Sequence, residues 1–126
     1  MSLKVLVDKR QEGEFVVSLS GLLDSQTYAE LGEKLKPNLV SSTKLLMLNM
    51  AEVSYISSMG ISTILHAKKF IEHGGNHFIM INLQPQIKLA FDIINALADM
   101  HVFQNIEEAD TYLAAMERKE IEKRNK

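Results

Sequence analysis

Residues 53–65 of this chain read VSYISSMGISTIL, and they follow the apolar run LLML at residues 45–48. A continuous apolar run is typical of a strand that is covered on both faces. We expect this strand to lead through a short polar turn to Ser57 and Ser58, where a helix begins. The adjacent glycines Gly74 and Gly75 predict the end of that helix.

The two serines stand at a position with two chemical uses. Serine is favoured at a helix N-terminus because its hydroxyl accepts a hydrogen bond from a free backbone N–H group. A phosphate also suits this position, since the free N–H groups and the helix dipole both favour negative charge. Ser57 or Ser58 is therefore a candidate to cap the helix, to act as a phosphorylation switch, or to do both.

The residues before this segment predict a hairpin and a helix. Apolar residues alternate with polar ones over residues 3–7, and residues 15–19 form a second β-rich run. We expect a turn at Gly13 between these two strands and an end to the second strand at Gly21. Asp24 is the expected N-cap of a helix that reaches Lys36.

The residues after this segment predict two further strands and two further helices. The strands are expected at residues 77–83 and 102–103. Pro85 suits the first turn of the third helix, and Asn105 with Glu108 has the spacing of a capping box at the start of the last. The order β-β-α-β-α-β-α-β-α predicts an α/β fold, with a mixed, largely parallel sheet of four to five strands and helices packed mainly on one side. The N-terminal hairpin should form one edge of the sheet.

The composition predicts one globular domain and excludes several classes of protein. The chain has 126 residues, of which 46% are hydrophobic, and a net charge of −2. We expect a single domain over residues 1–117, followed by a charged helix end or tail over residues 118–126. The near-balanced charge argues against direct nucleic-acid binding. The N-terminal apolar run is too short for a secretory signal, and no segment approaches the roughly 18 apolar residues of a membrane span. We therefore expect a cytoplasmic protein.

No set of residues predicts an enzyme. The chain lacks cysteine, a P-loop, a dinucleotide fingerprint and a G-x-S-x-G elbow. His66 and His73 can share a helical face, but two imidazoles without a third ligand make a weak zinc site. Asp24 has no evident partner for acid–base chemistry. We expect no catalytic activity, no metal and no cofactor.

The segments SLSGLLDSQT at residues 18–27 and LMLNMAEVSYISSMGISTIL at residues 46–65 resemble the STAS domain, the fold of the anti-sigma factor antagonists. In that family a strand leads to an Asp-Ser-Ser-Gly turn at a helix N-terminus, and a partner kinase phosphorylates the first serine. By this resemblance Ser58 falls on the phosphorylated serine and Gly60 on the glycine. Gly21 and Asp24 fall on the glycine and aspartate of the family's G-x-L-D segment.

Two residues of the turn depart from the family pattern. Ser57 stands where the family has aspartate, and Met59 replaces the second serine. The double serine leaves the phosphate acceptor open between Ser58, which the resemblance favours, and Ser57. Met59 is either an exposed contact residue or part of the core.

The resemblance implies a regulatory binding protein. It predicts an anti-sigma factor antagonist that sequesters an anti-sigma factor of the serine-kinase type, regulates transcription in this way, and is reset by a serine phosphatase. The expected partner-binding residues are Asp24, Ile56, Ser57, Ser58, Met59 and Gly60. The alternative is a STAS subunit of a stress-signalling complex or of a lipid-transport ATPase, in which the same surface makes a constitutive contact. A further alternative is that the serines only cap the helix.

Overall fold

A computed structural model of the chain describes residues 3–125. The elements of these residues follow the expected order. They are β1 (Lys4–Gln11), β2 (Glu14–Leu23), α1 (Tyr28–Leu35), β3 (Leu45–Ile56), α2 (Ser58–His73), β4 (His77–Ile81), α3 (Pro85–Ile93), β5 (His101–Phe103) and α4 (Ile106–Arg124), with 3-10 turns at Lys36–Asn38 and Leu97–Asp99.

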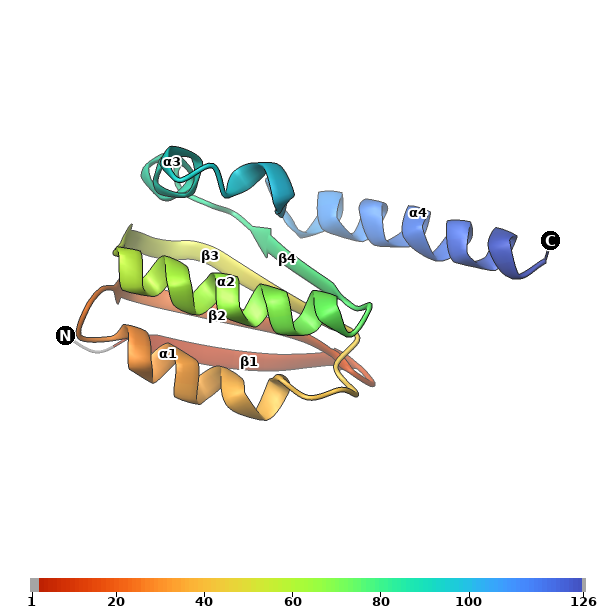
Figure 1. The fold of residues 1–126 in the computed structure, drawn as a ribbon, viewed down its shortest axis with the longest axis horizontal. Coiled ribbons are helices and arrows are strands. Elements are labelled where there is room, and N and C mark those ends of the chain that lie inside the picture. The colour runs from red at the N-terminus through yellow and green to blue at the C-terminus, as the bar shows by residue number, and fades with distance from the viewer. Residues whose placement is uncertain (1–2, 126) are drawn as a thin grey trace.

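The strands form one mixed sheet in the order β1-β2-β3-β4-β5. β1 pairs with β2 antiparallel, whereas the β2–β3, β3–β4 and β4–β5 pairs are parallel. Figure 1 shows β1 at one edge, so the hairpin occupies the expected place. The apolar run from Leu45 to Leu48 is buried in the central strand, as its composition predicts. The parallel pairing brings the carboxyl ends of β2, β3 and β4 to the same end of the molecule.

Helices cover the two faces of the sheet unequally, and each face has its own apolar core. Helices α1, α2 and α3 pack on one face, where Ile64 and Phe91 meet buried strand residues such as Phe78. On the opposite face, Ala109 of α4 packs against a smaller cluster that includes Met47. The arrangement confirms the expected fold class. The C-terminal half of α4 projects beyond the sheet (Figure 1), and residues 118–124 continue this helix.

Two expectations about strand ends are wrong. β3 does not stop before a polar turn but continues to Ile56, because its second half keeps pairing with β2. Gly21 does not end β2. It adopts a φ of 120°, a conformation that favours glycine, at a shift in the register between β2 and β3. Beyond this irregularity β2 continues to Leu23.

The helix ends are set by local hydrogen bonds, and one of them differs from the prediction. Asp24 is not the N-cap of α1, which begins after Thr27. The Asp24 carboxylate instead closes the turn before the helix. Gly75, with a φ of 78°, follows the last turn of α2 as expected, and the Asn76 N–H group donates to the Ile71 carbonyl there. No helix within residues 3–125 combines the length and the apolar character that crossing a membrane requires.

Candidate functional site

Three chain segments meet at the carboxyl end of the parallel strands, around the start of α2. The Ser57 N–H group donates to the Leu23 carbonyl over 2.8 Å, which joins the end of β2 to the two serines. On the other side, the amide nitrogen Nε2 of Gln86 donates to the Ser54 carbonyl over 3.1 Å. The turn at Asp24, the serines and the start of α3 therefore lie at one end of the molecule.

The two serines have different places in the helix. Ser57 is the N-cap of α2, and its hydroxyl accepts the Gly60 N–H group over 3.2 Å. Ser58 is the first helical residue and is exposed. Its hydroxyl takes part in none of the hydrogen bonds found among residues 3–125. The idea that one serine both caps the helix and serves as the switch is wrong for Ser58, since capping belongs to Ser57.

Capping by Ser57 explains how this chain tolerates its departure from the family pattern. Serine and aspartate are both strong N-cap residues, because each places a side-chain oxygen close to the N–H groups of the first turn. Ser57 thus supplies a capping oxygen, as an aspartate at this position would. The hydroxyl of Ser58 is left facing solvent beside N–H groups that the helix cannot satisfy internally.

Two of the predicted partner-binding residues lie beneath the surface. Gly60 is buried, and a Cβ atom on it would stand 2.7 Å from Cγ of Leu23 and 2.9 Å from the Leu23 carbonyl oxygen. The first turn of α2 can approach the end of β2 this closely only with glycine at residue 60. Ile56 is 7% exposed and belongs to the main core. Both residues support the turn that carries Ser57 and Ser58 from below.

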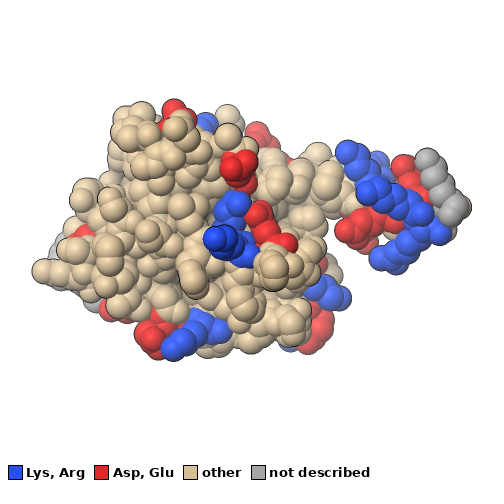
Figure 2. All heavy atoms as spheres, in the orientation of Figure 1, with Lys and Arg blue, Asp and Glu red and all other residues tan. Residues whose placement is uncertain are grey.

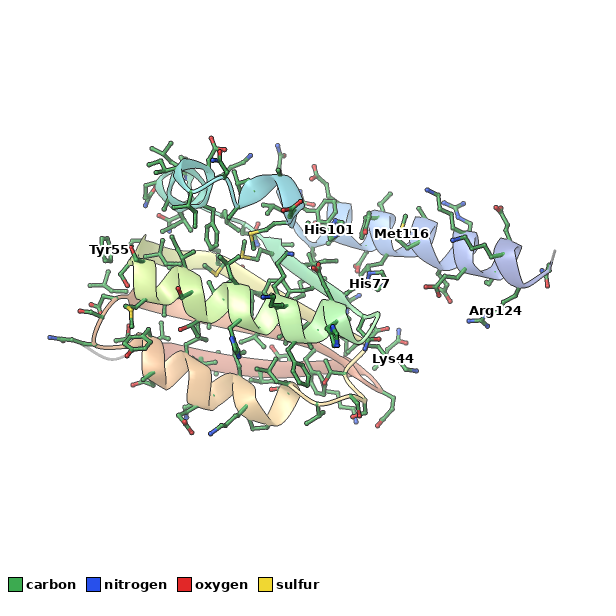
Figure 3. The ribbon with its side chains drawn as sticks, in the orientation of Figure 1. Lys44, Tyr55, His77, His101, Met116 and Arg124 are labelled. Carbon is green, nitrogen blue, oxygen red and sulfur yellow. The ribbon has the colours of Figure 1, made fainter. Side chains whose placement is uncertain are left out.

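The surface around the serines carries few charges and includes two exposed apolar or aromatic side chains. The side chain of Met59 is 44% exposed, so this residue is not part of the core. Tyr55 is 52% exposed and is placed by Figure 3 at the end of the sheet where α2 begins. In Figure 2 charged side chains are sparse at this end on the face shown. Tyr55 could not be identified from the sequence because a short polar turn was expected before the serines, whereas β3 continues to Ile56 and leaves Tyr55 exposed.

Asp24 contributes the negative charge nearest in sequence to this end of β2. Its carboxylate accepts the backbone N–H groups of Gln26 over 2.9 Å and of Thr27 over 3.1 Å. These bonds, that from Gln26 most of all, hold the pKa of Asp24 below its ordinary value of 3.8, although partial burial opposes the shift. The carboxylate is therefore ionised at neutral pH and holds the turn that lies beside the serines.

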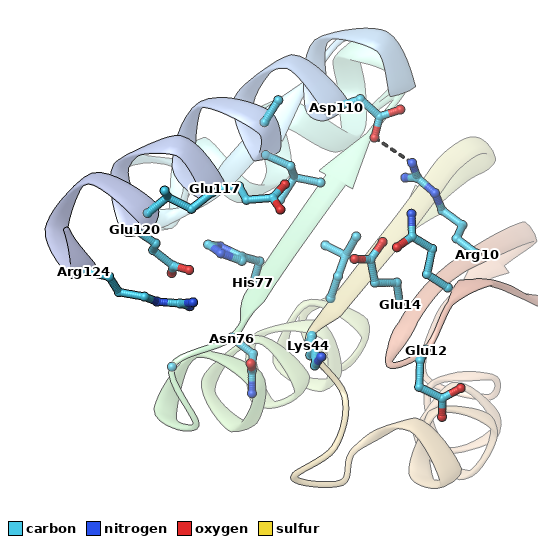
Figure 4. A pocket seen from close by; sticks show the side chains of 16 residues that line it. Arg10, Glu12, Glu14, Lys44, Asn76, His77, Asp110, Glu117, Glu120 and Arg124 are labelled. Atoms are coloured by element: carbon cyan, nitrogen blue, oxygen red, sulfur yellow. Dashed lines mark hydrogen bonds and ion pairs between the residues drawn. The ribbon is translucent and has the colours of Figure 1, made fainter.

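A hollow of about 880 Å³ lies at the opposite end of the sheet, between α4 and the β1–β2 turn (Figure 4). Its lining carries charges of both signs, such as Lys44 and Glu117, and the guanidinium of Arg10 pairs with Asp110 over 2.9 Å. Figure 3 places Lys44 and His77 at the end away from Tyr55. The hollow is thus separate from the serine turn.

Comparisons with known proteins show a family profile that matches this chain and solved structures that share its fold. The sequence profile of the STAS domain matches residues 6–109. The chain is 29% identical over 93 residues to the anti-sigma-B factor antagonist of Staphylococcus epidermidis, which covers 74% of this chain and 86% of that protein. A putative anti-sigma factor antagonist from Thermotoga maritima has the same fold, with a TM-score of 0.78 and 15% identity over 86% of this chain and 92% of that one. The Bacillus cell fate determinant SpoIIAA in its phosphorylated form has a TM-score of 0.68 and 17% identity over 86% of this chain and 99% of that one.

Proposed function

We propose that this chain, which belongs to the STAS domain family, is an anti-sigma factor antagonist whose binding surface is switched by phosphorylation of Ser58. The observation that carries the proposal is that the two serines have different structural roles. Ser57 caps α2, so the exposed hydroxyl of Ser58 is free to be modified without loss of the cap. The names of the staphylococcal relative and of the Thermotoga structure support the same function.

A phosphate on Ser58 leaves the fold intact. A phosphoserine carries about −1.5 to −2 charges at pH 7. At a helix N-terminus such a charge is favourable by about 0.3–1 kcal/mol when exposed. The modified side chain begins at the first residue of α2, points to solvent and has free N–H groups beside it. Phosphorylation therefore changes the surface and not the stability of the domain.

The same phosphate opposes binding of a partner that covers this end. The proposed contact surface consists of Asp24, Ser57, Ser58 and Met59, extended by Tyr55, while Ile56 and Gly60 hold it from below. A partner that packs on Tyr55 and Met59 must remove water from a phosphate at Ser58. An unpaired buried charge costs several kcal/mol. Because about 1.4 kcal/mol is a tenfold change in affinity, one phosphate suffices to release the partner.

The proposed partner is an anti-sigma factor of the serine-kinase type, which binds the unmodified chain and phosphorylates it. A serine phosphatase restores the unmodified form. The chain itself acts by binding and not by catalysis, and the cytoplasm is where a regulator of transcription meets these partners. The alternative is a STAS subunit that makes a constitutive contact through the same surface, and it predicts no effect of charge at Ser58.

The direct test is the intact mass of the protein after incubation with ATP and the cognate anti-sigma factor. We expect the addition of one phosphate to the natural protein and to Ser57→Ala, and none to Ser58→Ala. Phosphate on Ser58→Ala but not on Ser57→Ala would assign the switch to Ser57. The absence of phosphate from all three proteins, with a stable complex still formed, would favour the constitutive subunit.

Binding measurements with charged variants test the effect of the modification. Ser58→Asp should weaken binding of the anti-sigma factor at least tenfold, or by about 1.4 kcal/mol, without lowering thermal stability. Ser57→Asp is the matched control, because it adds the same charge one residue away and restores the cap residue of the family. Binding by Ser58→Asp as tight as that of the natural protein would contradict the phosphorylation switch.

A further inference from the structure

β1 is an open edge of the sheet. Every one of its residues except Val5 is exposed, and Leu6 and Val7 present 56% and 43% of their surface to solvent. Figure 1 shows β1 as the outermost strand, and no strand of residues 3–125 pairs with its outer side. The other edge is protected differently, since β5 has only 3 residues against the 8 of β1. A long exposed edge strand with apolar side chains is a template for pairing with another strand.

We propose that two copies of this chain associate through antiparallel pairing of β1, with Leu6 of one copy directly opposite Leu6 of the other. This register also sets Val5 opposite Val7. It places Lys4 of each copy opposite Asp8 of its partner copy. The contact is two-fold symmetric, as in most homodimers, and the same short surface serves both copies.

The side chains in this register complement one another. Lys4, Leu6 and Asp8 alternate along β1 and therefore share one face of the sheet, the face on which α4 packs farther along. Neither Lys4 nor Asp8 belongs to any ion pair among the described residues. Both charges are thus available to a second copy. Two Lys–Asp pairs then flank a Leu–Leu contact, and directly opposite pairs of this kind stabilise a sheet.

Neighbouring registers are disfavoured by geometry or by charge. A shift that sets Leu6 opposite Val7 is excluded by geometry, because these two residues lie on opposite faces of the sheet and directly opposite residues share a face. A register centred on Val7 sets Lys4 opposite Arg10. Like charges directly opposite are destabilising, whereas the register centred on Leu6 sets Lys4 opposite Asp8 in both halves of the contact. Lysines on an edge strand commonly prevent pairing; in β1 they select one register of self-pairing.

The dimer leaves the turn that carries Ser57 and Ser58 accessible. Lys4 pairs with Ser20 near the carboxyl end of β2, so β1 begins at the end of the molecule that carries Ser58. Antiparallel pairing sends the two Ser58 sites to opposite ends of one continuous sheet. The contact is a single pair of strands, and interfaces below about 1,200 Å² belong to weak or transient complexes. We therefore expect a dimer that forms as the concentration rises.

Sedimentation of the full chain over a concentration series tests the dimer and its register. The average mass of the natural protein should rise from 14.2 kDa toward twice that value. Asp8→Lys, which faces Lys4 of the second copy, should stay at the monomer mass, and Lys4→Asp combined with Asp8→Lys should restore the rise. Asp99→Lys makes the same charge change at an exposed residue far from β1 and should behave as the natural protein. A natural protein that stays monomeric throughout would overturn the proposal, as would an Asp8→Lys variant that still dimerises.

Cross-linking tests the register without any change of charge. The chain has no cysteine, so Leu6→Cys introduces a single thiol. Directly opposite residues have Cβ atoms about 4.5–5.5 Å apart, near the spacing of a disulfide. Mild oxidation should convert Leu6→Cys to a covalent dimer faster than Leu89→Cys, whose parent side chain is 57% exposed against 56% for Leu6. Equal rates for the two variants would show that β1 does not pair in this register.

Discussion

Replacement of Ser57 by alanine should destabilise the protein, whereas the same replacement at Ser58 should not. The Ser57 hydroxyl accepts the N–H group of Gly60 over 3.2 Å, and Gly60 is buried against the end of β2. The Ser58 side chain is exposed and forms no hydrogen bond within the part of the chain that the structure describes. The pair of variants therefore separates the cap from the proposed phosphate acceptor.

The size of the effect follows from the environment of the cap. Loss of an N-cap hydroxyl costs about 0.5–2 kcal/mol. Gly60 is a buried residue whose bond to Ser57 is partly buried, and a fully buried donor left without a partner costs about 1–3 kcal/mol. The bond of 3.2 Å is at the long end of the usual range, which favours the lower part of these values. We expect Ser57→Ala to lower the free energy of unfolding by about 1–1.5 kcal/mol. Ser58→Ala should change it by less than about 0.5 kcal/mol.

Urea unfolding followed by circular dichroism measures both variants against the natural protein. In a thermal unfolding experiment, a loss of 1 kcal/mol would appear as a fall of about 3–6 °C in the melting temperature of a domain of this size. Ser57→Asp is the control, because aspartate retains a capping oxygen and its charge suits the helix N-terminus; it should be as stable as the natural protein. An equal loss in Ser57→Ala and Ser58→Ala, or no loss in Ser57→Ala, would refute the assignment of the cap.

Two further predictions concern residues around the turn that carries Ser57 and Ser58. Gly60→Ala should destabilise the protein by about 1–3 kcal/mol, because the new Cβ atom meets Leu23 at 2.7 Å. Gly32→Ala in α1, where the nearest atom lies 3.9 Å away, should instead stabilise it by about 0.5–1 kcal/mol in the same unfolding assay; a stabilised Gly60→Ala would contradict the close packing. Asp24→Asn should be less stable than the natural protein at neutral pH, since the lowered pKa of Asp24 means that its ionised form stabilises the fold. This difference should be fully present above the ordinary pKa of 3.8 and disappear as the pH falls through the lower value in the folded protein, which unfolding curves at a series of pH values will show.

The candidate site could be located from the sequence, but its parts could not be told apart there. Ser58 is identified by its place at the start of a predicted helix and by the resemblance to the family, and Gly60 by the resemblance alone; the structure places both at the start of α2. That Ser57 rather than Ser58 caps the helix depends on how the chain enters α2 from β3, because only a residue in extended conformation turns its hydroxyl toward the first turn. The outward position of Tyr55 likewise depends on the pairing of β3 with β2 up to Ile56.

The sequence by itself determined the features that rest on short-range physics. The apolar run at residues 45–48 specifies a buried strand because water exclusion acts on each of its side chains. Gly75 ends α2 because glycine adopts a positive φ without strain. The tertiary structure decided features that require distant segments to meet. Gly60 is buried because α2 packs on Leu23 of β2, and β1 is an exposed edge because no strand of residues 3–125 lies beyond it. Such contacts depend on the arrangement of whole elements, to which the local pattern of residues contributes no direct signal.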